Sequence, residues 1–145
     1  MEREKTIMYL MDYLPRLHRK LFKNSMKMDS QNFTRHQFML LYTLDHFGEK
    51  PMKFFGEKLT ISKPNLSTLV DKMVEEKLIE RVSDEIDRRR VKIRISNNGK
   101  NVLKEHGDVL KKHLFKRVSV LSDSDIKSIN ESFDNIQTIL EKIQE

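Results

Sequence analysis

Residues 91–95 read VKIRI and alternate strictly between apolar and charged side chains. This period of two places the three apolar residues, Val91, Ile93 and Ile95, on one face of a strand. Residues 78–83, LIERVS, have the composition of a second short strand. The residues between them, 84–89, read DEIDRR, so the pattern predicts a hairpin with a charged tip. Taken alone, such a tip is equally typical of a hairpin that is merely solvated.

The segment before the hairpin predicts two helices joined by a tight turn. The first ends at about Leu59, and Thr60 and Ile61 form the turn. Ser62 is a favourable N-cap for the second helix, and Pro64 falls in the first turn, where a missing N–H is harmless. The second helix has an apolar stripe to bury, which consists of Leu66, Leu69, Val70 and Met73.

The opposite side of this second helix is polar. It carries Lys63, Asn65, Thr68 and Lys72, with Ser67 at the edge and Ser62 at the start. Hydroxyls, an amide and lysines suit base edges and phosphates, although the same residues occur on the surface of any helix. A helix-turn-helix followed directly by a charged hairpin is typical of a winged helix. In that fold one helix enters the major groove of DNA and the finger enters the neighbouring minor groove.

Helical patterns flank this region on both sides. The N-terminal segment, residues 1–30, predicts an amphipathic helix with a kink at Pro15. Thr34 and Gln37 form a capping box for a helix whose expected buried stripe is Phe38, Leu41, Leu44 and Phe47. After a helix from about residue 97 to 117, Ser122 and Asp125 cap a last helix. Its apolar residues recur at spacings of three and four, as in a heptad seam: Ile126, Ile129, Phe133, Ile136, Leu140 and Ile143. The seam fits either an intramolecular core or a second chain.

Composition narrows the classes of partner and site. The 145 residues are about one domain in length, and 28 Lys and Arg against 22 Asp and Glu give a net charge of +6. This surplus favours polyanionic partners such as nucleic acid, although many soluble proteins are as basic. The chain has no cysteine, which excludes disulfides, thiolate metal sites and thiol redox switches. No stretch approaches 18 apolar residues and no signal peptide is evident, so we expect a cytoplasmic protein that does not enter membranes.

The sequence does not favour an enzyme. It contains no Gly-rich phosphate loop, no cysteine nucleophile and no serine in a nucleophile elbow. His106 and His113 are seven residues apart and would share one helix face, but two such histidines are more typical of a surface than of a zinc site. We therefore expect no cofactor and no metal.

From Phe33 to Gly99 the sequence closely resembles the MarR family of bacterial transcription regulators. The matching residues are Leu59, 61–63, 69–72, 78–81, 87–89, 93–96 and Gly99. The resemblance implies one mainly α domain over residues 1–145 with a small β-hairpin. Within it, residues 33–96 would form a winged helix-turn-helix lobe, and residues 1–30 and 97–145 would form helices for dimerisation.

The resemblance also assigns roles to the hairpin tip. An arginine there would enter the minor groove; Arg89 is the first candidate and Arg88 the second, with Asp87 as the carboxylate that steadies it. The chain departs from the family at three positions. Thr60 and Lys77 stand where Gly is usual, and Thr68 stands where Arg is common, which leaves the base preference open.

The function implied is that of a sequence-specific DNA-binding transcription regulator. We expect a homodimer that acts as a repressor. It would bind a pseudo-palindromic double-stranded operator, and a small aromatic or anionic effector would release it. Tyr13, Arg16 and His36 are the candidate effector-binding residues, although plain surface or packing roles are more typical of such residues. A winged helix that contacts protein or RNA without a ligand response is the alternative.

Overall fold

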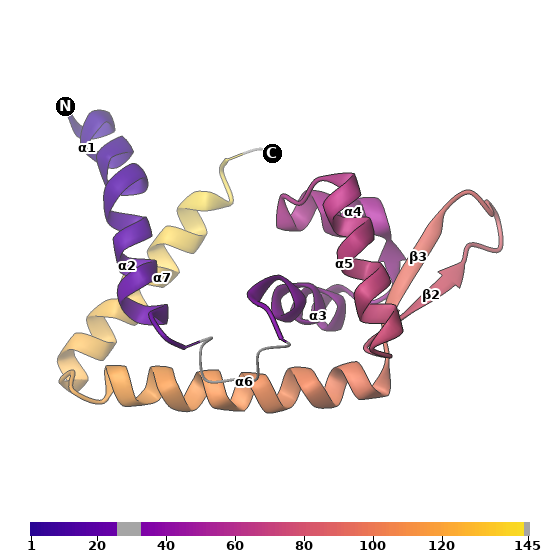
Figure 1. The fold of residues 1–145 in the computed structure, drawn as a ribbon. Coiled ribbons are helices and arrows are strands. Elements are labelled where there is room, and N and C mark those ends of the chain that lie inside the picture. The colour runs from indigo at the N-terminus through magenta and orange to yellow at the C-terminus, as the bar shows by residue number, and fades with distance from the viewer. Residues whose placement is uncertain (26–32, 144–145) are drawn as a thin grey trace. The chain divides into compact units, whose positions relative to one another are not determined.

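The computed structural model describes residues 1–25 and 33–143, and these form two compact units. One unit consists of residues 24–110, and the other combines residues 1–23 with residues 111–145. A long helix, α6 (Asn97–Val118), begins in the first of these units and ends in the second. Figure 1 labels the elements of both units. None of the described helices is long and apolar enough to cross a bilayer.

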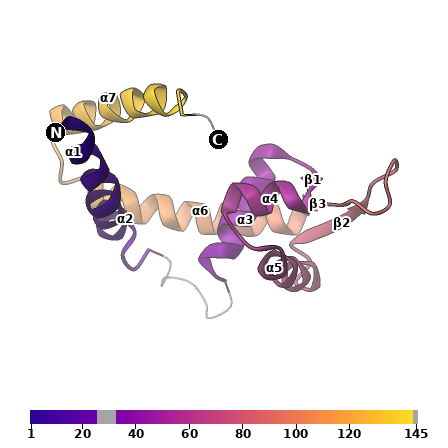
Figure 2. The same ribbon diagram turned by 90° about the horizontal axis from the view of Figure 1, so that it is seen from above.

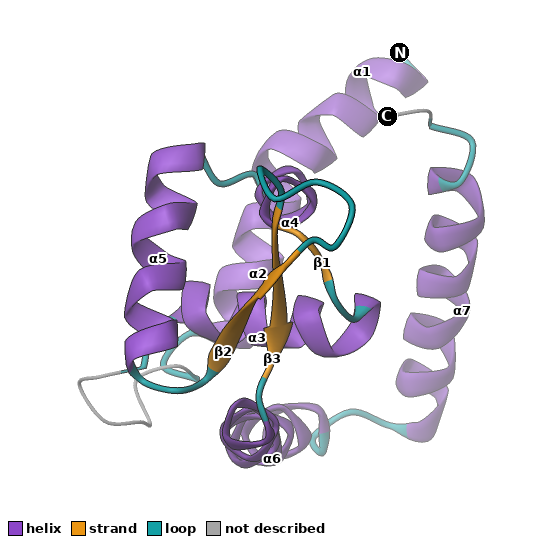
Figure 3. Cartoon of the chain, turned by 90° about the vertical axis from the view of Figure 1, so that its right-hand side faces the viewer, coloured by secondary structure: helices purple, strands orange, loops and turns teal. Residues whose placement is uncertain are grey.

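The unit of residues 24–110 contains three helices and a small sheet before α6. Its elements are α3 (Arg35–Phe47), β1 (Lys50–Pro51), α4 (Met52–Leu59), α5 (Lys63–Glu75), β2 (Ile79–Ser83) and β3 (Val91–Ile95). The sheet is antiparallel with the order β1-β3-β2, so β3 lies between the other two strands (Figure 3). The predicted fold class, mainly α with a β-hairpin in a winged helix, is confirmed. β1 was not predicted, because two residues that include a proline are too few to show a pattern.

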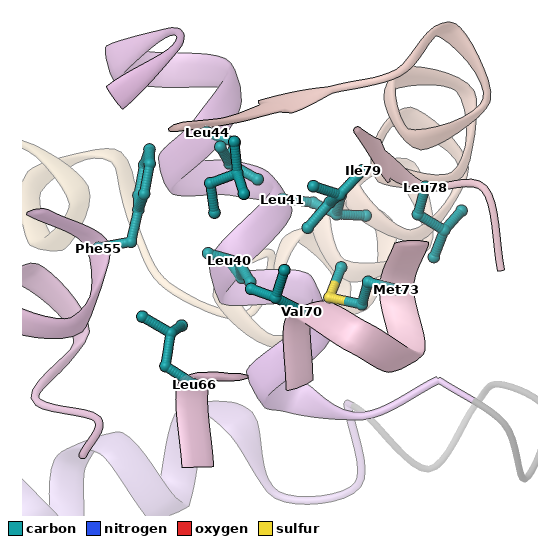
Figure 4. Packing of buried hydrophobic residues seen from close by; sticks show 10 residues of the cluster. Leu40, Leu41, Leu44, Phe55, Leu66, Val70, Met73, Leu78 and Ile79 are labelled. Atoms are coloured by element: carbon teal, nitrogen blue, oxygen red, sulfur yellow. The ribbon is translucent and has the colours of Figure 1, made fainter. Parts of the chain in front are cut away.

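The core of this unit lies where α3, α4, α5 and the sheet meet (Figure 4). Three leucines of α3 face Phe55 of α4 and the apolar stripe of α5, and Leu78, Ile79 and Ile93 cover them from the sheet side. The stripe of α5 is confirmed, with Leu66, Val70 and Met73 buried and Leu69 half-buried. The buried residues of the core are each at most 5% exposed; they are Leu40, Leu41, Leu44, Phe55, Leu66, Val70, Met73, Leu78, Ile79 and Ile93.

One residue that was expected in this core is exposed, and one core residue was not expected. Phe47 is 42% exposed, because it is the last residue of α3 and packs edge-on against Phe54 with ring centroids 5.2 Å apart. Leu40 occupies the core of α3 and was not among the predicted residues. Val91 is 39% exposed, since it lies at the end of β3 nearest the hairpin tip, whereas Ile93 is fully buried.

In the other unit, the N-terminal helix changes its winding before Pro15. It comprises α1 (Glu2–Met8), a π-helical segment η1 (Tyr9–Tyr13) and α2 (Leu14–Phe22), with Pro15 in the first turn of α2. Pro15 has no N–H for the Met11 carbonyl, and a wider turn accommodates that missing bond. The structure thus has a π-helical segment before Pro15, and the kink expected there stays a prediction. Residues 26–30 of the predicted N-terminal region lie outside the described residues.

The remaining elements of this unit are the end of α6 and α7 (Asp123–Leu140). The Arg117 guanidinium ties α6 to the end of α2 by donating to the carbonyl oxygens of Lys20 and Lys23, the latter at 2.7 Å. The predicted cap of α7 is confirmed: the backbone N–H of Asp125 donates to Ser122 Oγ, and that of Ser122 donates to the Asp125 carboxylate. No residue of α1, η1, α2 or α7 is buried.

Candidate nucleic-acid interface

Helix α5 presents one polar face to solvent. Ser62 is its N-cap, as predicted, with an extended backbone, but its hydroxyl makes no capping bond and is exposed. Lys63, Asn65, Thr68 and Lys72 are all exposed, and Ser67 at the edge of the face is half-buried. Burial of Leu66, Val70 and Met73 fixes this orientation, because a helix that turns those residues inward turns the polar residues outward.

Hydrogen bonding within this face restricts Thr68. Its hydroxyl donates to the carbonyl oxygen of Pro64, one turn earlier, over 3.1 Å. The hydroxyl oxygen can still accept a hydrogen bond, and the γ-methyl group can make an apolar contact. The side chain of Asn65 carries both a donor and an acceptor, which is the combination that recognises an adenine edge. The face therefore offers hydrogen-bonding and apolar groups flanked by the ammonium groups of Lys63 and Lys72.

The hairpin between β2 and β3 is a finger that extends away from the helices of its own unit (Figures 1 and 2). Two aspartates organise its tip through the main chain. Asp84 Oδ1 accepts from the backbone N–H of Ile86, and Asp87 Oδ1 accepts from that of Arg89, both at 3.0 Å. The bond from Ile86 is the main cause that lowers the pKa of the Asp84 carboxyl, and Lys92 Nζ, 3.9 Å from Asp84 Oδ2, adds to it.

Asp87 contacts two of the three arginines at the tip. Its Oδ2 lies 4.0 Å from Arg90 Nε, and its carbonyl oxygen accepts from the Arg90 N–H to close a turn. Arg88 and Arg89 occupy the centre of that turn and are exposed. Asp87 thus holds the backbone of Arg89 by accepting from the Arg89 N–H, and it forms its ion pair with Arg90. Arg88 and Arg89 are thus two exposed cations at the end of the hairpin, where the exposed carboxylate of Glu85 also lies.

Ion pairs join the finger to α5 and hold its two strands together. Arg81 on β2 donates to the carboxylate of Asp71 on α5. Arg94 Nε donates to Glu80 Oε2 over 2.7 Å between directly opposed positions of β2 and β3, and this bond raises the pKa of Arg94. These pairs were not predicted from the sequence, because Asp71 and Arg81 are ten positions apart on different elements. The only available signal was their place in the family motif.

Two of the three departures from the family pattern have an unusual backbone. Thr60 has φ 53° and Lys77 has φ 59°, both in the left-handed region that favours glycine. The turn between α4 and α5 and the turn after α5 thus keep the conformation that a glycine would adopt. The third departure, Thr68, is an ordinary residue of α5.

The remaining predicted residues belong to elements other than α5 and the hairpin. Tyr13 and Arg16 are exposed in the unit that contains α1 and α2, with Arg16 Nη2 3.7 Å from Asp12 Oδ2, and His36 is exposed on α3 of the other unit. His106 stacks on Phe33 with ring centroids 4.0 Å apart, and His113 Nε2 accepts from Arg117 Nε over 3.0 Å. No group of three or more His, Cys, Asp or Glu among residues 1–25 and 33–143 is placed to hold a metal ion.

Comparison with known proteins finds that this chain is similar to transcription regulators. A model of the MarR family matches residues 33–91. A relative in Bacillus subtilis, the uncharacterized HTH-type transcriptional regulator YpoP, is 27% identical over 131 residues, which are 90% of this chain and 93% of YpoP.

Solved structures share the fold at lower identity. The transcriptional regulator BldR from Sulfolobus solfataricus has a TM-score of 0.76 at 22% identity, with 99% of this chain and 100% of that chain covered. The PcaV transcriptional regulator from Streptomyces coelicolor, solved in complex with its natural ligand, has a TM-score of 0.64 at 20% identity, with 93% and 92% covered.

Proposed function

Because a model of the MarR family matches residues 33–91, we propose that the chain is a DNA-binding transcription regulator. One observation carries the proposal: the exposed polar face of α5 is tied by the Asp71–Arg81 ion pair to a finger that ends in Arg88 and Arg89. A recognition helix for the major groove and an arginine-tipped wing for the minor groove are the two parts that a winged helix needs. Residues 33–96 are the DNA-binding lobe in this proposal.

Individual residues in this lobe have distinct roles. Asn65 and Thr68 read base edges, while Lys72 contacts a phosphate. Ser62, Lys63 and Ser67 lie around the same helix end and complete the contact surface. Arg89, with Arg88 as the second candidate, enters the minor groove, where a flat and weakly hydrated guanidinium suits a narrow electronegative space.

The proposed regulator is a homodimer. The apolar residues of α1, η1 and α7 have too little cover in a single chain: Ile7, Leu10, Met11, Phe133, Ile136 and Leu140 are at least half exposed. Ile143, which follows the end of α7, is also more than half exposed. Apolar surface on this scale marks an interaction site, and a second copy supplies a helix for the seam of α7. Twofold symmetry then requires a pseudo-palindromic operator whose half-sites are about one helical turn, roughly 34–36 Å, apart.

Repression and release by an effector complete the proposal. A dimer seated on an operator blocks transcription, and a small aromatic or anionic molecule at Tyr13 and Arg16 releases it. His36, in the other unit, is a separate candidate contact. The solved complex of PcaV with its natural ligand supports this, as does the surface hollow that Tyr13 and Arg16 both line. Titration of an aromatic carboxylate into the DNA complex should then lower DNA affinity in the parent chain and less in Arg16→Ala.

The experiment that tests the function is to recover genomic DNA fragments with the purified full-length chain and sequence them. The proposal expects enrichment of a small set of fragments that share an inverted repeat. Tighter binding to single-stranded or duplex RNA than to any recovered fragment would instead favour the alternative of an RNA-binding winged helix. Recovery of fragments without a shared motif would contradict sequence-specific regulation.

A further inference from the structure

A buried amide connects α3 to the end of α5. Gln37 is fully buried, and both ends of its side-chain amide are engaged. Its Oε1 accepts from the backbone N–H of Thr34 over 2.8 Å, and its Nε2 donates to Glu76 Oε2 over 2.8 Å. Glu76 is the C-cap residue of α5, so this bond fixes one carboxylate oxygen at the last turn of that helix.

The other oxygen of the same carboxylate faces a lysine of the DNA-facing side. Glu76 Oε1 lies 3.8 Å from Lys72 Nζ, and the two side chains are 34% and 49% exposed. Asn65, Thr68, Lys72 and Glu76 follow one another at spacings of three and four, so they continue along one side of the helix. The ammonium group of Lys72 is therefore paired before any DNA arrives.

Helix stability alone does not explain this arrangement. A carboxylate at a helix C-terminus opposes the helix dipole. A lysine four residues before a glutamate is also the less favourable order for such a pair. The hydrogen bond from Gln37 offsets this local cost by holding the carboxylate beside Lys72. A carboxylate at the edge of a surface that contacts phosphates also repels them and lowers the affinity for DNA. Such a residue is useful there only if it improves selectivity.

We propose that Glu76, anchored by Gln37, is a specificity-determining residue that neutralises Lys72 until a duplex is seated in the correct register. Non-specific affinity for DNA comes from lysines and arginines that displace counterions from phosphates. A lysine held by a carboxylate adds little to that affinity. In the specific complex a phosphate takes the place of the carboxylate beside Lys72 Nζ. This inference rests on the proposed function.

The test measures DNA affinity by fluorescence anisotropy over a salt series, on a recovered operator duplex and on a scrambled duplex. Glu76→Gln keeps an oxygen that can accept from Gln37 Nε2 but removes the charge. For the scrambled duplex, its plot of log affinity against log salt should steepen by up to about 0.9 per protomer. The ratio of operator to scrambled affinity should fall about 3- to 10-fold, since an exposed pair is released in each protomer.

Glu75→Gln is the matched control, because it removes the same charge one residue earlier from an exposed position on the same helix. It should change both affinities alike and leave the ratio near that of the parent. In a Lys72→Ala background, Glu76→Gln should no longer lower the ratio. Lys72→Ala by itself should weaken operator binding while leaving affinity for the scrambled duplex nearly unchanged, a result that does not depend on the folding of any Glu76 variant.

Several outcomes separate this inference from the function on which it rests. If the parent binds operator, but Glu76→Gln and Glu75→Gln give the same ratio, the inference is wrong and the proposed function stands. Equal losses of operator and scrambled affinity in Lys72→Ala would also overturn it. If the parent binds neither duplex, the proposed function fails and the inference fails with it.

Discussion

Lys77 and Thr60 are single residues whose backbone conformation affects the stability of the fold. Each adopts a left-handed backbone, with φ 59° and 53°, at a position where the resembling family has glycine. A side chain with a Cβ costs roughly 1–2 kcal/mol in this region. The sequence identified both positions as departures from the family pattern. It did not reveal their backbone angles, because those are set by how α5 must turn into β2 and α4 into α5.

Lys77→Gly should therefore raise the free energy of unfolding. Relief of the left-handed strain outweighs the extra entropy that glycine gives the unfolded chain, for a net gain of about 0.5–1 kcal/mol. Urea denaturation followed by circular dichroism measures the change. Lys104→Gly, at an exposed position in the interior of α6, is the control and should lower the free energy of unfolding by about 1 kcal/mol. A loss of stability in Lys77→Gly as large as that of the control would refute the argument.

Gly99 is needed for close packing rather than for its backbone angle. A Cβ built on Gly99 would lie 2.1 Å from the carbonyl oxygen of Leu78 and 2.9 Å from a side-chain carbon of Ile95. Its N–H also donates to Ser96 Oγ, whose hydroxyl donates to the Lys77 carbonyl. The Ser-to-Gly spacing was part of the family motif in the sequence, and the structure supplies its physical reason.

Gly99→Ala should lower the free energy of unfolding by about 2–3 kcal/mol, because the methyl group meets backbone that must shift. Gly107→Ala on the same helix is the matched control. No atom of residues 1–25 or 33–143 lies within 4 Å of a Cβ there, so it should gain about 1 kcal/mol from helix propensity. Thermal melts of the two variants test the contrast, which would be contradicted by equal effects of both substitutions.

At the scale of elements, local signals in the sequence determined most of the boundaries. The capping boxes at Thr34 and Ser122 mark the starts of α3 and α7, and the alternation in 91–95 gives β3. The predictions failed where packing between elements decides the outcome. Phe47 is exposed because α3 ends at it, and β1 forms only because β3 offers a free edge to Lys50 and Pro51. The charge pairs between α5 and β2 likewise depend on tertiary structure.

The cap of α7 should depend on pH. The hydrogen bond from the Ser122 hydroxyl is the main cause that lowers the pKa of the Asp125 carboxyl, with the Ser122 backbone N–H next. A carboxyl with a lowered folded pKa stabilises fully above its unfolded pKa, and that contribution is lost as the pH falls through the folded pKa. Asp125→Asn should thus be less stable than the parent at pH 7 and equal to it in strong acid. An unchanged difference at pH 7 and at pH 2 would contradict this.

At the scale of the whole molecule, the exposed apolar residues of α1, η1 and α7 support the proposal that a partner covers these helices. The heptad spacing predicted the seam of α7, but spacing alone left open whether it packs within one chain. The structure leaves Ile136 half exposed and Phe133 more so, and the proposed partner is a second copy. Tyr13 and Arg16 belong to one unit and His36 to the other, and their role in effector binding stays a prediction.

Disruption of the α7 seam should yield monomers. Ile136→Glu places a charge in the proposed interface, and deletion of residues 122–145 removes the helix, so the deleted chain should aggregate or unfold. Sedimentation equilibrium should give a dimer for the parent and a monomer for Ile136→Glu. Thr138→Glu, which introduces the same charge on the other side of α7, should stay dimeric. A soluble, folded monomer after the deletion would show that the seam is not the interface.

The measurement that tests the central claim most directly is the affinity of the full-length chain for its operator across a salt series, with Arg89→Ala and Asn65→Ala. Arg89→Ala should weaken binding strongly and flatten the plot of log affinity against log salt by up to about 0.9 per lost phosphate-equivalent contact. Asn65→Ala should keep the slope and relax base preference, at a cost of about 1–3 kcal/mol. If Arg89→Ala bound the operator as tightly as the parent at every salt concentration, the hairpin would not be a DNA-reading wing.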